Sequence, residues 1–221
     1  MKAKVLGFVH TSATLVPLFQ QLSAEFLTGI ETFNIVDDSL IKDVIKKGEL
    51  MPNTAARVVK HIQAAEAAGA DVILVTCSSI GQAIETAATL ASVPVIRVDQ
   101  AMADEAVQTG NRIGVIATLP TTLAPTSDLV KRRAAFANKN VSITSKLCDG
   151  AFEALMSGNA AKHDEMVAKA LKELMLEVDV IVLAQASMAR VVEALSAEEK
   201  RVPILASPAI AMKKLAETYF K

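Results

Sequence analysis

The feature that most constrains this chain is an internal repeat, in which short apolar segments recur in the same order in the two halves. Residues 4–14 (KVLGFVHTSAT) correspond to residues 112–122 (RIGVIATLPTT). Each copy has a basic residue, an apolar run with one glycine, and a hydroxyl-rich turn. At the same spacing, residues 71–79 (DVILVTCSS) correspond to residues 179–187 (DVIVLAQAS). The repeat predicts two lobes of one fold.

A third pair of segments, residues 93–96 and 202–205, repeats one residue out of step with the others. Three elements in one order are hard to obtain by chance. A duplicated chain offers a site on the pseudo-twofold axis, at the interface of the two lobes. We therefore expect Cys77 to face Gln185 across that interface.

Strand and helix patterns alternate along both halves. Short apolar runs predict strands at residues 4–9, 32–36, 72–75, 113–116, 141–144 and 180–183. Helical spacing of apolar residues predicts helices at residues 15–27, 54–68, 79–90, 127–137, 163–177, 188–195 and 209–220. Ser79 with Gln82 fits a capping box at the start of the third helix.

This alternation predicts an α/β fold with parallel sheets and right-handed crossovers. We expect two pseudo-symmetric, doubly wound (Rossmann-like) lobes, residues 1–100 and 101–221, with a C-terminal helix that can return to the first lobe. At 221 residues and 52% hydrophobic, the chain can bury a sizeable core in each lobe.

Composition excludes several classes of protein. The net charge of −1 and the interspersed signs give no basic stripe, so no nucleic-acid partner is expected. No apolar run approaches the ~18 residues of a membrane span. Residues 1–4 lead directly into a strand pattern without a signal peptide, and two cysteines suggest no disulfide framework. We expect a reduced, cytoplasmic protein.

Cofactor and metal sites are not indicated either. The chain has no P-loop and no GxGxxG after its first strand. Its three histidines are scattered, and no Cys/His spacing suggests zinc. No cofactor and no metal are therefore expected.

Hydroxyl-rich turns follow the predicted strands. They fall at residues 10–12, 76–79, 118–122 and 185–187. In open parallel sheets, the binding crevice lies at the carboxyl ends of the strands. These turns therefore predict a site for a small molecule.

Cys77 ends one of these strands and precedes a helix. Free backbone amides and the positive end of the helix dipole favour a thiolate at such a position. The sulfur could act as a nucleophile or as a proton acceptor. The alternative is a buried, inert cysteine.

Across both halves, the chain resembles the aspartate/glutamate/hydantoin racemase superfamily. The resemblance rests on the Gly7 strand with its polar turn and on residues 76–79, 113–118 and 202–207. It implies two Rossmann-like halves that each contribute a cysteine, need no cofactor, and move a proton at a carbon next to a carboxylate. It also implies a homo-oligomer.

The chain departs from this pattern where the family has its second cysteine, because Gln185 stands there. A glutamine amide cannot exchange a proton with carbon near neutral pH, so Gln185 is expected to be a polar recognition group. His10 stands where relatives resembling glutamate racemase have an acidic residue. It could donate a proton, partner the thiolate, or only cap the strand end.

The resemblance also assigns residues to the substrate carboxylate, mostly through backbone amides and hydroxyls. They are Thr11, Ser78, Ser79, Thr118, Thr122, Ala186 and Ser187.

Other polar residues receive weaker expectations. Cys148 lies outside the strand-end motifs and is expected to be structural. Asp38 and Ser39 either rim the pocket or form an acidic surface turn. Arg97 and Arg190 could each pair with an anionic group, but both are expected to be solvated surface arginines.

Two functions follow from this reading. The first is a cofactor-independent, racemase-like enzyme that acts next to the carboxylate of a small carboxylic-acid or amino-acid-like substrate, with Cys77 as its working thiol and decarboxylase or lyase chemistry open. The second is a non-catalytic protein that binds a small carboxylate on the same scaffold.

Overall fold

The computed structural model describes residues 4–221, which divide into two compact units. The first unit runs to Gln100 and includes Pro208–Lys221, and the second unit is Ala101–Ser207. The Met1-Lys2-Ala3 lead-in lies outside the described residues. Within the described chain, no helix is long and apolar enough to cross a membrane.

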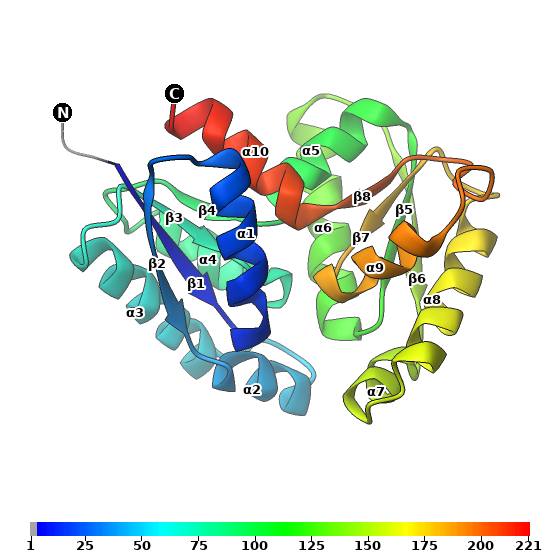
Figure 1. Cartoon of the computed structure of the whole chain (residues 1–221), viewed down its shortest axis with the longest axis horizontal. Helices are drawn as coiled ribbons and strands as arrows, with labels where there is room; N and C mark the ends of the chain where they lie inside the picture. Colours follow the sequence, from blue (N-terminus) through cyan, green and yellow to red (C-terminus); the bar gives the residue numbers. More distant parts are fainter. Residues whose placement is uncertain (1–3) are drawn as a thin grey trace. The chain divides into compact units, whose positions relative to one another are not determined.

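The first unit contains a four-stranded parallel sheet in the order β2-β1-β3-β4 (Figure 1). Its strands are β1 (Val5–His10), β2 (Glu31–Val36), β3 (Val72–Val75) and β4 (Val95–Arg97). Its helices are α1 (Val16–Phe26), α2 (Ser39–Lys47), α3 (Pro52–Ala67), α4 (Gly81–Ala88) and α10 (Ser207–Tyr219).

Helices cover both faces of this sheet because its central strands are apolar on both sides. Leu6 and Phe8 of β1 pack in a core with α1 and α10. Val9, the next residue, packs in another core with α2, α3 and α4. Burial on both faces is the pattern expected of parallel strands with crossover helices.

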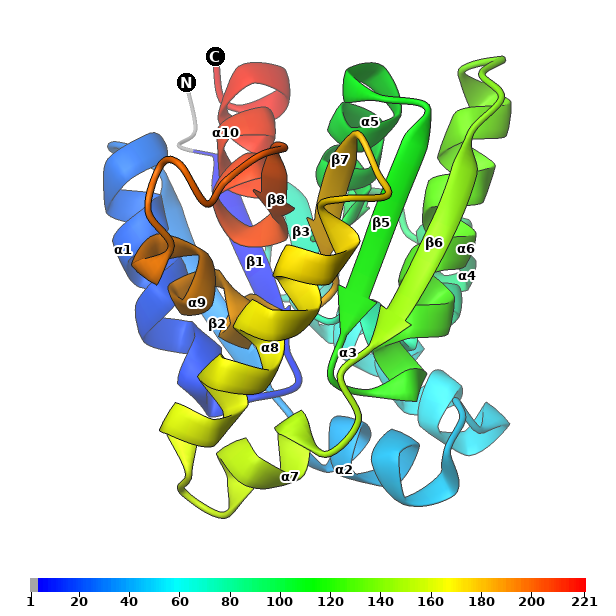
Figure 2. The same cartoon turned by 90° about the vertical axis from the view of Figure 1, so that its right-hand side faces the viewer.

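The second unit contains a four-stranded parallel sheet in the order β6-β5-β7-β8. Its strands are β5 (Arg112–Ala117), β6 (Ser142–Leu147), β7 (Val180–Leu183) and β8 (Ile204–Ala206). Its helices are α5 (Gln100–Thr109), α6 (Pro120–Phe136), α7 (Ala151–Met156), α8 (Ala160–Leu174) and α9 (Ala189–Ala194). Figure 2 shows β5 and β6 side by side, with α7 beyond their arrowheads.

The two sheets have the same strand order, so the prediction of two doubly wound α/β lobes with parallel sheets is confirmed. The C-terminal helix packs with the first unit, where Ala211, Met212 and Leu215 join its core. The second unit therefore ends at Ser207 and not at the end of the chain.

Strand register corrects the sequence alignment of the first repeat segment by one residue. In the first unit Leu6 pairs with Val72, and in the second Ile113 pairs with Val180. Val72 and Val180 are equivalent in the alignment, so Leu6 corresponds to Ile113. Gly7 then corresponds to Gly114 and Thr11 to Thr118.

The paired glycines have a common physical reason. A Cβ on Gly7 would lie 3.0 Å from the Cβ of Ala70, and one on Gly114 would lie 2.8 Å from Cδ2 of Leu174. Both distances are too short for ordinary packing. Glycine at this position therefore lets the strand approach the chain that covers it.

Some local predictions were wrong. α2, α5 and α7 were not predicted, and α6 begins at Pro120 although Pro125 lies inside it. Ser79 is not the N-cap of α4 as the predicted capping box required, because the chain first makes a 3₁₀ turn, η2 (Ser78–Ile80), and α4 begins at Gly81 with Ile80 as its N-cap.

Candidate active site

Cys77 follows β3 and precedes η2, at the carboxyl end of the first unit's sheet. Its sulfur accepts hydrogen bonds from the Thr11 hydroxyl and from the backbone amides of Ser79 and Ile80. Cys77 as a whole residue is partly exposed, although its thiol group is desolvated. Thr11, Cys77 and Ser79 are thus brought together within one unit, as their positions after β1 and β3 predicted.

The ionisation of Cys77 does not follow the expectation from a helix N-terminus. Burial raises the pKa of the thiol, and the negative charge of Asp99 acts in the same direction. The hydrogen bonds from Thr11, Ser79 and Ile80 lower the pKa without reversing this effect. Desolvation of the charged form outweighs the donors, so the resting sulfur favours the thiol.

His10 is the last residue of β1 and is fully buried. Its Nε2 lies 2.9 Å from Oδ1 of Asn34, and its Nδ1 lies 2.8 Å from the hydroxyl oxygen of Thr76. The ring stacks on Phe8, with centroids 5.5 Å apart.

Burial lowers the pKa of His10, and the hydrogen bond to Asn34 only partly opposes this. A neutral imidazole donates from one nitrogen and accepts at the other. With the Asn34 carbonyl oxygen as acceptor, Nε2 carries the proton, and Nδ1 pairs with the Thr76 hydroxyl, which also donates toward the Val9 carbonyl over 3.4 Å. Both nitrogens are therefore engaged with side chains inside the first unit.

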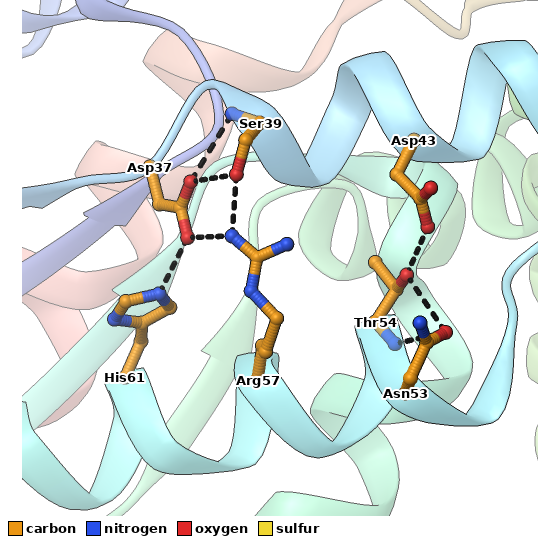
Figure 3. Close-up of polar contacts among 7 residues, drawn as sticks. All are labelled: Asp37, Ser39, Asp43, Asn53, Thr54, Arg57 and His61. Carbon is orange, nitrogen blue, oxygen red and sulfur yellow. Dashed lines mark hydrogen bonds and ion pairs between the residues drawn. The ribbon is translucent and has the colours of Figure 1, made fainter.

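Asp37, directly after β2, forms the centre of a polar cluster at the same edge of the sheet (Figure 3). Its backbone amide donates to the His10 carbonyl over 3.0 Å. Its carboxylate accepts from Ser39 at the start of α2, and from Arg57 and His61 on α3 at 2.6 and 2.8 Å.

Partial burial raises the pKa of Asp37. The hydrogen bonds from Ser39, His61 and Arg57 have the larger combined effect and lower the pKa to about 2. Arg57 also donates to the Ser39 hydroxyl. Ser39 is thus part of an internal cluster that ties α2 to α3. Asp38 differs, since it is exposed and pairs with Lys42.

Gln185 follows β7 in the second unit, at the position equivalent to Cys77. Its Oε1 accepts from the backbone amide of Thr118 at 2.6 Å and from the Thr118 hydroxyl at 3.0 Å. Thr118 is the register equivalent of Thr11. The same hydroxyl position therefore serves the thiol in one unit and the glutamine amide in the other.

The remaining candidate residues lie in the turns that were predicted to contain them. Ser78 and Ser79 are buried in η2, and Ala186 and Ser187 lie half-buried in the equivalent 3₁₀ turn, Ala186–Met188. Thr122 is buried near the start of α6. Their contact with a substrate carboxylate stays a prediction, as does the apposition of Cys77 and Gln185.

Arg97 was expected on the surface, and that expectation was wrong, because only 3% of its side chain is exposed. Arg97 donates to both oxygens of Asp99, at 3.0 and 2.8 Å. Arg190 is exposed as expected and pairs with Asp164 at 2.8 Å. The missed signal was an arginine that ends a strand and an aspartate two residues later in the following turn.

Cys148 lies after β6 and is buried in the second unit's core. Burial raises the pKa of its thiol to about 11, although Lys146 lowers it. Among residues 4–221, no three His, Cys, Asp or Glu side chains are grouped so that they could hold a metal ion.

The fold resembles several solved racemases. The glutamate racemase isoform RacE1 from Bacillus anthracis has a TM-score of 0.74 and 17% identity, covering 98% of this chain and 82% of that one. Glutamate racemase from Francisella tularensis, solved in complex with D-glutamate, has a TM-score of 0.73 and 15% identity, covering 100% and 82%. Allantoin racemase from Klebsiella pneumoniae has a TM-score of 0.67 and 19% identity, covering 99% and 88%.

Identities this low establish similarity of fold alone. No curated protein matches the chain in sequence. The family model for Asp/Glu/hydantoin racemases, however, matches residues 7–215, which is nearly the whole chain. The chain therefore belongs to the Asp/Glu/hydantoin racemase family.

Proposed function

We propose that this protein is a cofactor-independent enzyme that acts at the carbon next to the carboxylate of a small acid, with Cys77 as its working thiol. The observation that carries the proposal is the position of the Cys77 thiol directly after β3, where it accepts from the Thr11 hydroxyl and two backbone amides. Membership of the racemase family supports proton transfer at carbon as the chemistry.

Substrate binding is assigned to the turns at the strand ends. Backbone amides and hydroxyls of such turns suit a carboxylate because they supply donors without a competing charge. The proposed set is Thr11, Ser78, Ser79, Thr118, Thr122, Ala186 and Ser187, with Gln185 as a recognition group. Anchored through its oxygen to Thr118, Gln185 has its NH₂ end turned away from Thr118, in an orientation suited to donation.

Cys77 and Gln185 occupy equivalent positions after β3 and β7, and proton transfer is assigned to Cys77 alone. The resting Cys77 thiol first loses its proton to solvent, and the thiolate then removes the proton from the substrate carbon, which leaves the electron pair on an enolate-like carbanion and forms the S–H bond. The reverse step breaks S–H and restores C–H. Because Gln185 cannot take part, the residues support exchange on one face of the carbon and not inversion by two thiols.

His10 is assigned a positioning role. Its two nitrogens are bonded to Asn34 and Thr76, and Thr76 directly precedes Cys77. The ring therefore supports the backbone that presents the sulfur. A buried, neutral imidazole with both nitrogens engaged is poorly suited to donate a proton to substrate.

The test is exchange of the carbon-bound proton with D₂O, followed by NMR over a panel of amino acids, 2-hydroxy acids and malonates. Exchange of at least one acid is expected, and Cys77→Ala should reduce its rate by at least about 10³-fold, because the thiol is the acid–base group. Cys148→Ala is the matched control and should keep the rate within about twofold. Exchange that survives Cys77→Ala would overturn the assignment.

A second candidate function is non-catalytic binding of a small carboxylate. It is favoured by Gln185, since the position that pairs with Cys77 in the repeat holds an amide already bonded to Thr118. In that case some acid should raise the melting temperature of the protein while no acid in the panel exchanges its proton.

A further inference from the structure

Arg97, the last residue of β4, is a buried arginine whose guanidinium is engaged on two sides. It forks onto Asp99, with Nε 3.0 Å from Oδ1 and Nη2 2.8 Å from Oδ2. Its Nη1 lies 2.5 Å from Oε1 of Glu85 on α4. A bidentate pair together with this third contact fixes the plane of the guanidinium. The group is therefore held in one place between the end of β4 and α4.

Gly81, the first residue of α4, lies against this guanidinium. A Cβ at Gly81 would collide with its Cζ, Nη1 and Nη2 atoms. The backbone of Gly81 has helical angles, φ −54° and ψ −41°, which any residue can adopt. Glycine is therefore required here by the space that Arg97 occupies and not by the conformation of the turn.

The second unit has different residues at the equivalent positions. Strand register and the order of the elements give the equivalent pairs, which are Arg97 and Ala206, Asp99 and Pro208, and Gly81 and Ala189. Ala189 starts α9 with φ −58° and ψ −41°, almost the angles of Gly81. The unit without the arginine thus has a residue with a Cβ at the start of its helix. This difference between the repeats supports the link between the arginine and the glycine in the first unit.

The turn that precedes Gly81 contacts the Cys77 sulfur. Cys77 is the N-cap of η2, and α4 follows this turn at once. The sulfur accepts from the backbone amides of Ser79 and Ile80, the two residues before Gly81. Because peptide units are planar, a fixed position for Gly81 constrains the direction in which these two amides point.

We propose that Arg97 is a positioning residue for Cys77, because its guanidinium packs against Gly81 and so fixes the turn whose amides contact the sulfur. This inference deepens the proposed function and rests on it. Arg97 acts through the backbone of the turn and not by contact with the substrate. Loss of the contact should free the turn without removing a hydrogen-bond donor from the site.

The test is amide hydrogen exchange of the full chain, measured by NMR. The quantity compared is the ratio of the exchange rates of the Ser79 and Ile80 amides to the rate of the Ile73 amide in the inner strand β3. Gly81→Ala keeps every charged group and only adds a methyl where the guanidinium lies. It should raise the ratio at least about tenfold, because the turn opens while the sheet stays paired.

A double-mutant cycle separates this contact from a general effect of the added methyl. In the Arg97→Met background the guanidinium is gone, so the further change Gly81→Ala should alter the ratio by less than about twofold. Arg97→Lys is the second variant if Arg97→Met does not fold. It keeps the charge but loses the planar fork, and should itself raise the ratio at least about threefold. Leu215→Ala, in the buried core beside α10, is the control for overall stability and should not raise the ratio.

The reaction supplies a second measurement. For an acid that exchanges its proton with D₂O, the rate constant should fall at least about fivefold in Gly81→Ala, because the sulfur is no longer held in position, and should stay within about twofold in Leu215→Ala. An unchanged rate constant beside a raised amide ratio would overturn the proposal.

The amide rates can overturn it as well. An unchanged ratio in Gly81→Ala would do so, as would a rise of the same size in the Arg97→Met background. A ratio in Arg97→Lys equal to that of the unmodified chain would have the same consequence.

These results are separate from the proposed function. Amide exchange reports on the turn whether or not any acid exchanges its carbon-bound proton. Failure of proton exchange in every acid would remove the proposed reaction, and the amide rates would still decide whether Arg97 fixes the turn at Cys77.

Discussion

The carboxyl ends of the two sheets carry different side chains on the same backbone. After the four strands of the first unit stand Thr11, Asp37, Cys77 and Asp99, and the equivalent positions in the repeat are Thr118, Cys148, Gln185 and Pro208. The first set is polar or ionisable at every position. The second keeps only the Thr118–Gln185 contact.

What the two halves share is backbone support. Asp71 accepts from the Val5 amide at 2.8 Å, and Asp179 accepts from the equivalent Arg112 amide at the same distance. Likewise Thr76 donates its amide to Val9, and Ala184 donates to Ile116, both at 3.0 Å. The repeat therefore preserves what forms the sheet, and it differs at strand ends, where side chains can change without disrupting the strands.

The largest expected effect separates the buried Arg97–Asp99 ion pair of the first unit from an exposed ion pair, Arg112–Asp179, in the second. Arg97→Met should lower the free energy of unfolding by about 3–5 kcal/mol, because it leaves Asp99 buried without a partner. Arg112→Met is the matched control. It should cost less than about 1 kcal/mol, because 59% of the Arg112 side chain is exposed. Urea denaturation measures both, and equal losses would contradict the comparison.

A smaller loss is expected at His10, whose register equivalent in the second unit is Ala117. His10→Ala should lower the free energy of unfolding by about 2–3 kcal/mol, since it removes a buried ring and its hydrogen bonds to Asn34 and Thr76. His61→Ala, at a partly exposed histidine with a bond to Asp37, should cost less. A larger loss of unfolding free energy in His61→Ala than in His10→Ala, measured by urea denaturation, would contradict the structural role of His10.

The smallest effect concerns Asp37, which corresponds to Cys148. The pKa of Asp37 is lowered from 3.8 to about 2 in the folded protein, so the unfolded chain binds more protons in acid. Asp37→Asn should therefore cost about 1–2 kcal/mol at pH 7, a value reduced for partial solvent screening. The cost should shrink as pH falls from about 5 toward 2. Urea denaturation at several pH values tests this, and a pH-independent difference would contradict it.

Much of the fold followed from local patterns. The strand at residues 180–183 was predicted at its observed bounds, and the helix predicted to end at residue 68 ends at Ala67. Predictions failed where local signals conflicted. Asp37-Asp38-Ser39 looked like a turn, yet α2 begins at Ser39 because Leu40 and Val44 bury one face. The helix predicted to start at residue 127 starts at Pro120, and it continues through Pro125.

The sequence predicted the main residues of the candidate site but not the residues that hydrogen-bond or pair with their neighbours. Cys77, Thr11 and Ser79 were identified because hydroxyl-rich turns follow strands in the sequence. Asn34 and Asp99 were not, since nothing local marks an amide within a strand or an aspartate after one as the partner of a particular side chain. Oligomeric state and cytoplasmic location stay predictions.

The sequence by itself determined the duplication, the parallel α/β lobes and the edge of each sheet at which polar residues gather, because periodicity and spacing are properties of neighbouring residues. Only the tertiary structure decided that Gly7 matches Gly114, that Arg97 is buried against Asp99, and that the Cys77 thiol is favoured over its thiolate. Those outcomes depend on strand register and on desolvation, which arise from residues far apart in the chain.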